Sequence, residues 1–111
     1  MLFYEGSTLV LTVEEKETNG KILMALKGEL KSEAAHHIQD ELDAFTTVGV
    51  KVILDFREVS FIAPSVLSAL LNSQQLIDYF RQGEILLTNI PDTVYQEMDD
   101  TGITELLMIE D

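Results

Sequence analysis

Hydrophobic and polar residues alternate along the chain in two ways, and together they predict most of the secondary structure. Residues 8–17 and 21–27 carry apolar side chains at every second position, a pattern typical of strands with one buried face. Asn19 and Gly20 between them favour a tight hairpin turn, because both tolerate positive φ. Residues 50–56 are almost continuously apolar, which predicts a central strand buried on both faces.

Apolar residues at helical spacing predict three helices, over residues 33–46, over residues 64–81, and between Pro91 and Gly102. Ser32 is the expected N-cap of the first helix, since its hydroxyl can accept a bond from a free N–H group. Gly83 is expected to end the second. The residues expected to face the core from these helices are Ala34, Ile38, Leu42, Phe45, Leu67, Leu70, Leu71, Ile77, Phe80, Val94, Tyr95 and Met98.

An apolar run at 84–89 predicts a further strand and residues 106–109 a final short strand or turn, giving the order β-β-α-β-α-β-α-β. This order predicts an α/β fold in one domain, residues 1–111, with a mostly parallel mixed sheet of about five strands and three to four helices. Sites in such sheets lie beyond the carboxyl ends of the strands. We therefore expect functional residues in the loops 28–32 and 57–65.

Charge narrows the range of partners. Seven Lys and Arg against twenty Asp and Glu leave a net charge of −13, and nothing after Arg81 is basic up to Asp111. Such a surface repels nucleic acid and anionic lipid and suits a basic protein patch, although the acids also serve simple solubility. The apolar run 9–13 is too short for an export signal or a membrane span. We expect a cytoplasmic protein.

Most enzyme chemistry lacks its residues in this sequence. The chain contains no Cys and no glycine-rich phosphate loop, which excludes disulfides and thiolate sites. His36 and His37 are adjacent, and helical geometry turns neighbouring side chains about 100° apart. We therefore expect them to be structural and not to share one metal ion. The sequence predicts no enzyme activity, no cofactor and no metal.

Ser65 lies in the first turn of the second predicted helix, directly after a strand. Free N–H groups and the positive end of the helix dipole point outward there. A phosphate would bring about −1.5 to −2 of charge to a favourable place. We expect an outward-facing hydroxyl that is a candidate phosphorylation site, the ordinary alternative being helix capping.

Several segments resemble the STAS domain, the module of bacterial anti-sigma-factor antagonists and of the cytoplasmic tails of sulfate transporters. The resemblance covers about residues 8–109. Residues 63–71 match the family's D-S-S-G-L-G-x-L-L segment without a gap. The other matching segments are Gly28-Glu29-Leu30, Ser32-Glu33-Ala34-Ala35, residues 52–56, residues 59–62, residues 83–89 and Thr101-Gly102-Ile103.

The resemblance implies a regulator of transcription and signal transduction that works by protein–protein contact. In that family a partner kinase, which is also the anti-sigma factor, phosphorylates the second Ser of D-S-S-G, and the phosphorylated form releases it. By position that residue is Ser65. The partner-binding residues expected from the two loops are Glu29, Lys31, Ser32, Ala63, Pro64, Ser65, Val66 and Leu67.

The sequence departs from the family pattern around this serine. Ala63, Pro64 and Val66 replace the motif's Asp, first Ser and Gly, and Lys31 replaces an Asp of the earlier loop. Two alternatives therefore stay open. One is an adaptor or transporter accessory subunit that has lost the phosphoswitch. The other is a small anion or nucleotide sensor that uses Lys31 and the helix N-terminus.

Overall fold

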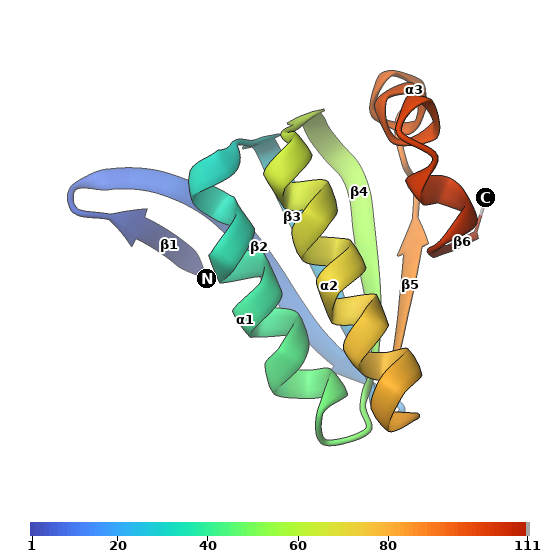
Figure 1. Cartoon of the computed structure of the whole chain (residues 1–111). Helices are drawn as coiled ribbons and strands as arrows, with labels where there is room; N and C mark the ends of the chain where they lie inside the picture. Colours follow the sequence, from blue (N-terminus) through green and yellow to red (C-terminus); the bar gives the residue numbers. More distant parts are fainter. Residues whose placement is uncertain (111) are drawn as a thin grey trace.

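The sheet follows the order of the sequence from one edge to the other. The computed structural model describes residues 1–110, so Asp111 lies outside the described residues. The strands are β1 (Leu2–Glu5), β2 (Thr8–Thr18), β3 (Lys21–Leu30), β4 (Lys51–Ile62), β5 (Glu84–Thr88) and β6 (Met108–Glu110) (Figure 1). The pairs β1–β2 and β2–β3 are antiparallel and the other three are parallel. The predicted α/β class and mostly parallel mixed sheet are confirmed, with β1 as one more strand than expected.

Helices connect the parallel strands. They are α1 (Ala35–Thr46), α2 (Pro64–Phe80) and α3 (Asp92–Asp100), with short 3-10 helices η1 (Ser32–Ala34) and η2 (Ile103–Glu105). The prediction of Ser32 as N-cap of the first helix is wrong, because Ser32 begins η1 and makes no capping bond. At the end of α2, Arg81 takes the left-handed conformation before Gly83 is reached. No helix within residues 1–110 is long and apolar enough to cross a lipid bilayer.

Both long helices cover the same face of the sheet. Because each parallel strand is added on the same side of the last, right-handed crossovers place α1 and α2 together (Figure 1). The side chains of β4 that point toward them, including Leu54 and Phe56, are buried, whereas Ile53 and Asp55 are only half-buried. The prediction that this strand is buried on both faces is therefore wrong.

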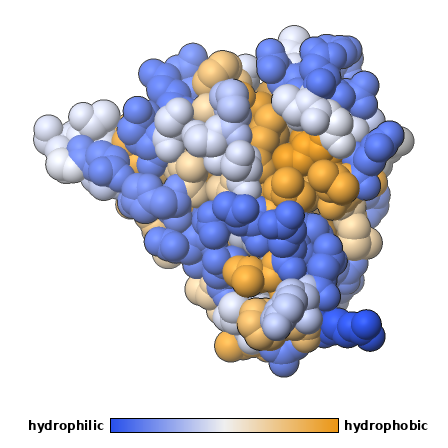
Figure 2. All heavy atoms as spheres, in the orientation of Figure 1, coloured by the Kyte–Doolittle hydropathy of each residue, from blue (hydrophilic) through white to orange (hydrophobic). Residues whose placement is uncertain are grey.

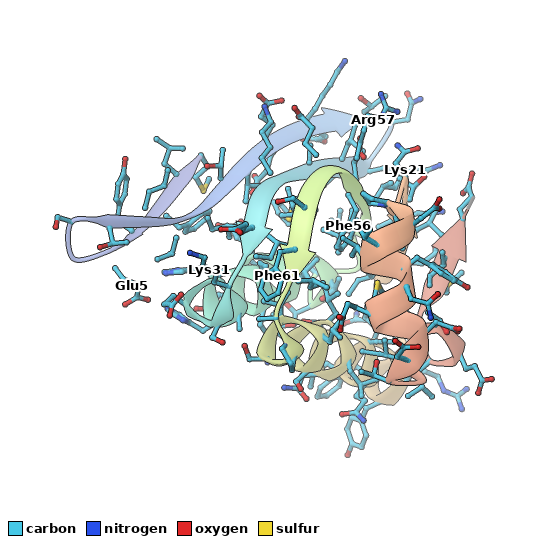
Figure 3. All side chains as sticks on the ribbon, turned by 90° about the horizontal axis from the view of Figure 1, so that it is seen from above. Glu5, Lys21, Lys31, Phe56, Arg57 and Phe61 are labelled. Carbon is cyan, nitrogen blue, oxygen red and sulfur yellow. The ribbon has the colours of Figure 1, made fainter. Side chains whose placement is uncertain are left out.

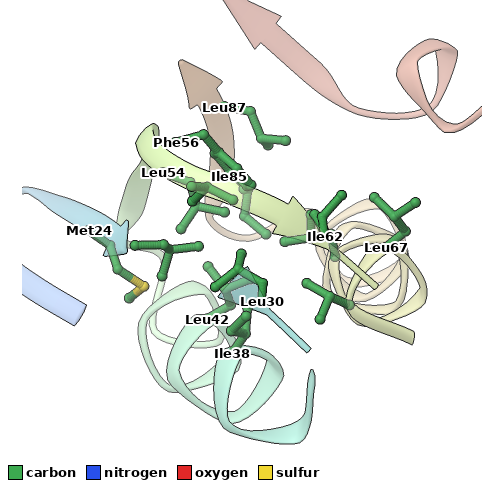
Figure 4. Close-up of a cluster of buried hydrophobic side chains, with 14 of the residues drawn as sticks. Met24, Leu30, Ile38, Leu42, Leu54, Phe56, Ile62, Leu67, Ile85 and Leu87 are labelled. Carbon is green, nitrogen blue, oxygen red and sulfur yellow. The ribbon is translucent and has the colours of Figure 1, made fainter. Parts of the chain in front are cut away.

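The core lies between this face and the two helices, and Figure 4 shows its centre. Leu30, Leu42 and Phe56 have no exposed surface there. Two residues expected in the core lie outside it. Phe80 ends α2 with 60% of its surface exposed, and Tyr95 on the short α3 is 40% exposed because its neighbour Val94 takes the inward position.

Strand β4 is longer than predicted, and this changes the start of α2. The sequence predicts a turn after residue 56, but β4 pairs with β3 as far as Ile62, opposite Leu30. Only Ala63 then separates the strand from α2. The expected loop 57–65 is therefore largely strand. Helix α2 begins directly after the carboxyl end of β4.

Candidate partner-binding site

The ends of β3 and β4 bring the two predicted loops together. Glu29 lies opposite Phe61 in the parallel register, and the Ala63 N–H donates a hydrogen bond of 2.8 Å to the Leu30 carbonyl. Figure 3 views the molecule from this end, with Lys31 and Phe61 labelled at the ends of β3 and β4. Residues 28–32 and the start of α2 thus form one continuous surface.

The hydroxyl of Ser65 does not face solvent. Pro64 is the first residue of α2 and Ser65 the second, so Ser65 lies in the first turn as predicted. Its side-chain oxygen, however, is shielded from water and makes no hydrogen bond. The expectation of an outward-facing hydroxyl is therefore wrong. Since only Ala63 joins β4 to α2, the first turn of the helix stays close to the sheet edge instead of standing clear on a loop.

The eight predicted partner-binding residues divide by exposure. The side chains that a partner could reach are those of Glu29, Lys31, Ser32 and Pro64, all exposed. Ala63, Val66 and Leu67 are buried and belong to the hydrophobic core. Ser65 is half-buried. The four exposed side chains therefore form a rim around the start of α2. The buried residues lie beneath this rim and support it by packing.

An apolar groove next to this rim was not predicted from the sequence. It has a volume of about 260 Å³ and lies between the first turns of α2 and η2. Figure 2 shows apolar side chains gathered between α2 and the segment around α3 and η2. The lining residues are Pro64, Leu67, Ser68, Leu71, Thr101, Ile103 and Leu106. Leu106 was predicted in a final short strand or turn; it lies at the end of η2, outside β6, and lines the groove with 58% of its surface exposed.

Lys31 does not share a groove with Ser65. Its ammonium is 3.5 Å from a carboxylate oxygen of Glu29, and both side chains are exposed. Lys31 lines a groove of about 690 Å³ between the β1–β2 hairpin and the end of β3, whose lining does not include Ser65. The positive charge is thus paired with Glu29, and the anion pocket of Lys31 and the α2 N-terminus is not assembled.

A second lysine in the same groove is also matched by acids. The Lys27 ammonium lies 2.6 Å from Glu14 and 3.7 Å from Glu58. The hydrogen bond with Glu14 raises the pKa of Lys27, and the same bond lowers the pKa of Glu14. Both cations of the groove therefore have acidic partners, which leaves no free positive site for an anion in it.

The two histidines do converge, contrary to the expectation from helical geometry. The Nε2 atoms of His36 and His37 both lie 3.2 Å from the same carboxylate oxygen of Glu5, at the end of β1. Their ring centroids are 3.9 Å apart. Neighbouring Cβ directions diverge by about 100°, but an imidazole nitrogen lies far enough from the backbone for both rings to lean toward one point. Glu5 belongs to a strand that was not predicted, so this cluster could not be found from the sequence pattern.

The arrangement of sheet and helices defines the class of fold. An open mixed sheet covered by helices on one face defines an α/β fold. The sequence model of the STAS domain matches residues 12–111. The chain belongs to the STAS domain family.

Solved structures with the same fold include regulators and a transport-related protein. A putative anti-sigma factor antagonist from Thermotoga maritima is 21% identical with a TM-score of 0.78, covering 89% of this chain and 86% of its own. The unphosphorylated anti-sigma factor antagonist SpoIIAA is 18% identical with a TM-score of 0.72, at 90% and 89% coverage. A sulfate transporter family protein from Wolinella succinogenes is 22% identical with a TM-score of 0.61, at 81% and 73%. No curated protein sequence matches significantly.

Proposed function

We propose that the protein is a non-enzymatic regulatory module that binds an anti-sigma factor with serine-kinase activity, and that phosphorylation of Ser65 releases this partner. The observation that carries the proposal is the apolar groove beside the start of α2. Exposed apolar grooves with polar rims are typical of protein interfaces. Leu106 in the groove and Phe61 near the end of β4, 58% and 45% exposed, supply side chains that a partner could bury.

Charge around the groove indicates the chemistry of the partner. Asp99, Asp100 and Glu105 are exposed and flank the groove residues Thr101 and Ile103 along the chain. A partner that buries the groove therefore meets negative charge beside it. Complementary surfaces speed association and exclude like-charged competitors. We infer that the partner presents basic residues around an apolar centre, in the bacterial cytoplasm where transcription is regulated.

Phosphorylation at Ser65 would act on this contact through desolvation. The side chain must first turn about its Cα–Cβ bond, because its oxygen is shielded in the present conformation. The phosphate would then add about −1.5 to −2 of charge at the helix N-terminus. Pro64 and Leu67, which lie within two residues of Ser65, line the groove. A partner covering them would have to desolvate the phosphate, and this cost favours release.

A constitutive adaptor is the second candidate, and the shielded oxygen of Ser65 favours it. In that case Ala63 and Val66 mark a switch that has been lost, and the same groove holds a partner permanently. An accessory role beside a transporter is one form of this candidate. The anion-sensor hypothesis has no corresponding support, because Lys31 is paired with Glu29 in another groove.

The test mixes the protein with each serine-kinase-like anti-sigma factor encoded in its source genome and measures binding by calorimetry. We expect one of them to bind, and Leu106→Asp in the groove to abolish that binding. Leu23→Asp is the matched control, because Leu23 is exposed on β3 but does not line the groove. Equal loss in both variants, or no binding by any of these proteins, contradicts the proposed function.

The same mixture with ATP distinguishes the two candidates. After incubation, mass spectrometry locates any added phosphate. Phosphate on Ser65, absent in Ser65→Ala, supports the switch. Stable binding with no phosphate on the protein supports the adaptor. Phosphate on Ser68 or another serine, with Ser65 unmodified, contradicts the assignment of the site.

A further inference from the structure

Three potential metal ligands come together at the start of α1, away from the groove proposed to hold the partner. They are one carboxylate oxygen of Glu5 and one imidazole nitrogen each of His36 and His37, and all lie within 4.8 Å of one another. Within residues 1–110 they form the one group of this kind. Glu5 ends β1 and the two histidines lie in the first turn of α1, so segments 31 residues apart in the chain meet here.

The distances from the Glu5 carboxylate to the two imidazoles match those between ligands of one small metal ion. Each Nε2 lies 3.2 Å from the Glu5 Oε1. Zn²⁺ binds imidazole nitrogen and carboxylate oxygen at about 2.0–2.2 Å, and tetrahedral geometry then separates neighbouring ligands by about 3.3 Å. The ligand spacing therefore needs little adjustment to hold an ion.

The hydrogen bonding of the cluster is incomplete without a cation. The Nε2 of His37 is shielded from water and makes no hydrogen bond, although it lies close to the Glu5 carboxylate. Buried nitrogens normally have a partner. An ion between the three atoms would accept the lone pairs of both imidazoles and neutralise the carboxylate. The ring of Phe3 lies 5.2 Å from that of His37 and supports its orientation.

The ligand set also selects the class of metal. Imidazole nitrogen suits Zn²⁺, Cu²⁺ and Ni²⁺, whereas Mg²⁺ and Ca²⁺ prefer oxygen ligands alone. The chain has no Cys, so thiolate sites are excluded. We propose that Glu5, His36 and His37 form a binding site for a divalent transition-metal ion, with Zn²⁺ as the representative, that clamps the β1–β2 hairpin onto α1. Three protein ligands leave a fourth position for water.

The test is calorimetric titration of the untagged, chelator-treated full chain with ZnCl₂. We expect one ion per chain. Glu5→Gln, His36→Gln and His37→Gln should each weaken binding about tenfold or more. Glu33→Gln is the matched control, because Glu33 is an exposed acid of the neighbouring groove outside the cluster, and binding should be unchanged. His36 is 60% exposed, so its replacement is not expected to affect folding.

Two further measurements test which side chains bind the ion and whether the site is selective for Zn²⁺. In NMR spectra, Zn²⁺ should shift the ring signals of both histidines together. Excess Mg²⁺ should leave Zn²⁺ binding unaffected. The proposal is overturned if folded protein binds no Zn²⁺, or if binding persists in the His36→Gln/His37→Gln double variant. Displacement by Mg²⁺ would also overturn it, since that would indicate a site made of surface acids alone.

Discussion

Both long helices begin at the carboxyl ends of parallel strands, but the connections that lead into them differ. Between β3 and α1 the chain inserts η1, and the start of α1 then carries the exposed His36 beside the largely buried His37, both close to Glu5. Between β4 and α2 there is only Ala63, and the hydroxyl of Ser65 is shielded. A polar residue near a helix N-terminus is therefore not accessible by position alone.

Leu30 supports both helix starts, and its truncation should have the largest effect. It ends β3 with no exposed surface, beside the connection to η1 and opposite Ile62. Leu30→Ala should lower the free energy of unfolding by about 2–5 kcal/mol, measured in urea, because it leaves a cavity. Leu23→Ala on the same strand is the control, since Leu23 is 37% exposed. Equal losses in the two variants would mean that the end of β3 is not a shared support.

The far ends of the two helices offer the next test. A Cβ at Gly83, which follows α2, would lie 2.6 Å from the Thr46 carbonyl oxygen at the end of α1, and its φ is +79°. Gly83→Ala should cost about 2–4 kcal/mol of unfolding free energy in the same urea experiment, from strain and the clash together. Gly102→Ala shares the positive φ but meets nothing within 4 Å, so it should cost only about 1–2 kcal/mol. If both variants cost the same, the helix ends are not packed as described.

An added negative charge at each helix start tests directly how accessible the two sites are. Ser65→Asp must accommodate a carboxylate where the hydroxyl is shielded, and should destabilise the protein by about 1–3 kcal/mol. Ser32→Asp places the same charge on an exposed residue of η1 and should change stability by less than about 0.5 kcal/mol. Thermal unfolding of both variants measures the difference. A destabilising Ser32→Asp with a neutral Ser65→Asp would reverse the comparison.

The smallest effect concerns the side of α1 that faces β2. Desolvation, followed by contact with the Glu15 carboxylate, raises the pKa of Glu41 from 4.5 to about 7. The folded state then holds this proton more tightly than the unfolded state, so stability falls as pH rises from about 4.5 to 7. Glu41→Gln should flatten that part of the stability curve. Glu97→Gln, on the exposed face of α3, should leave it unchanged.

Periodicity in the sequence was enough to predict the α/β class and most of the strands and helices. The alternation in 8–17 and 21–27 and the helical spacing of Ile38 and Leu42 reflect burial on one face, which survives in the structure. The predictions that were wrong concerned segments whose structure depends on strands far away in the sequence. The extension of β4 to Ile62 comes from pairing with β3, and β1 gained its place by pairing with β2.

The candidate site was predictable in part for the same reason. That the strand ends meet follows from a parallel sheet, and the register of β3 and β4 confirms it. Whether Ser65 is shielded depends on packing that no local pattern encodes. The groove that includes Leu106 and the cluster at Glu5 each join segments far apart in the chain. Neither could be found from one segment alone.

The proposed regulation depends on what a phosphate at Ser65 does to the partner. The most direct measurement compares the affinity of the identified anti-sigma factor for the unmodified protein and for protein phosphorylated at Ser65, at equal ionic strength. We predict about 30-fold weaker binding of the phosphorylated form, equivalent to about 2 kcal/mol. Equal affinity for the two forms would contradict the account.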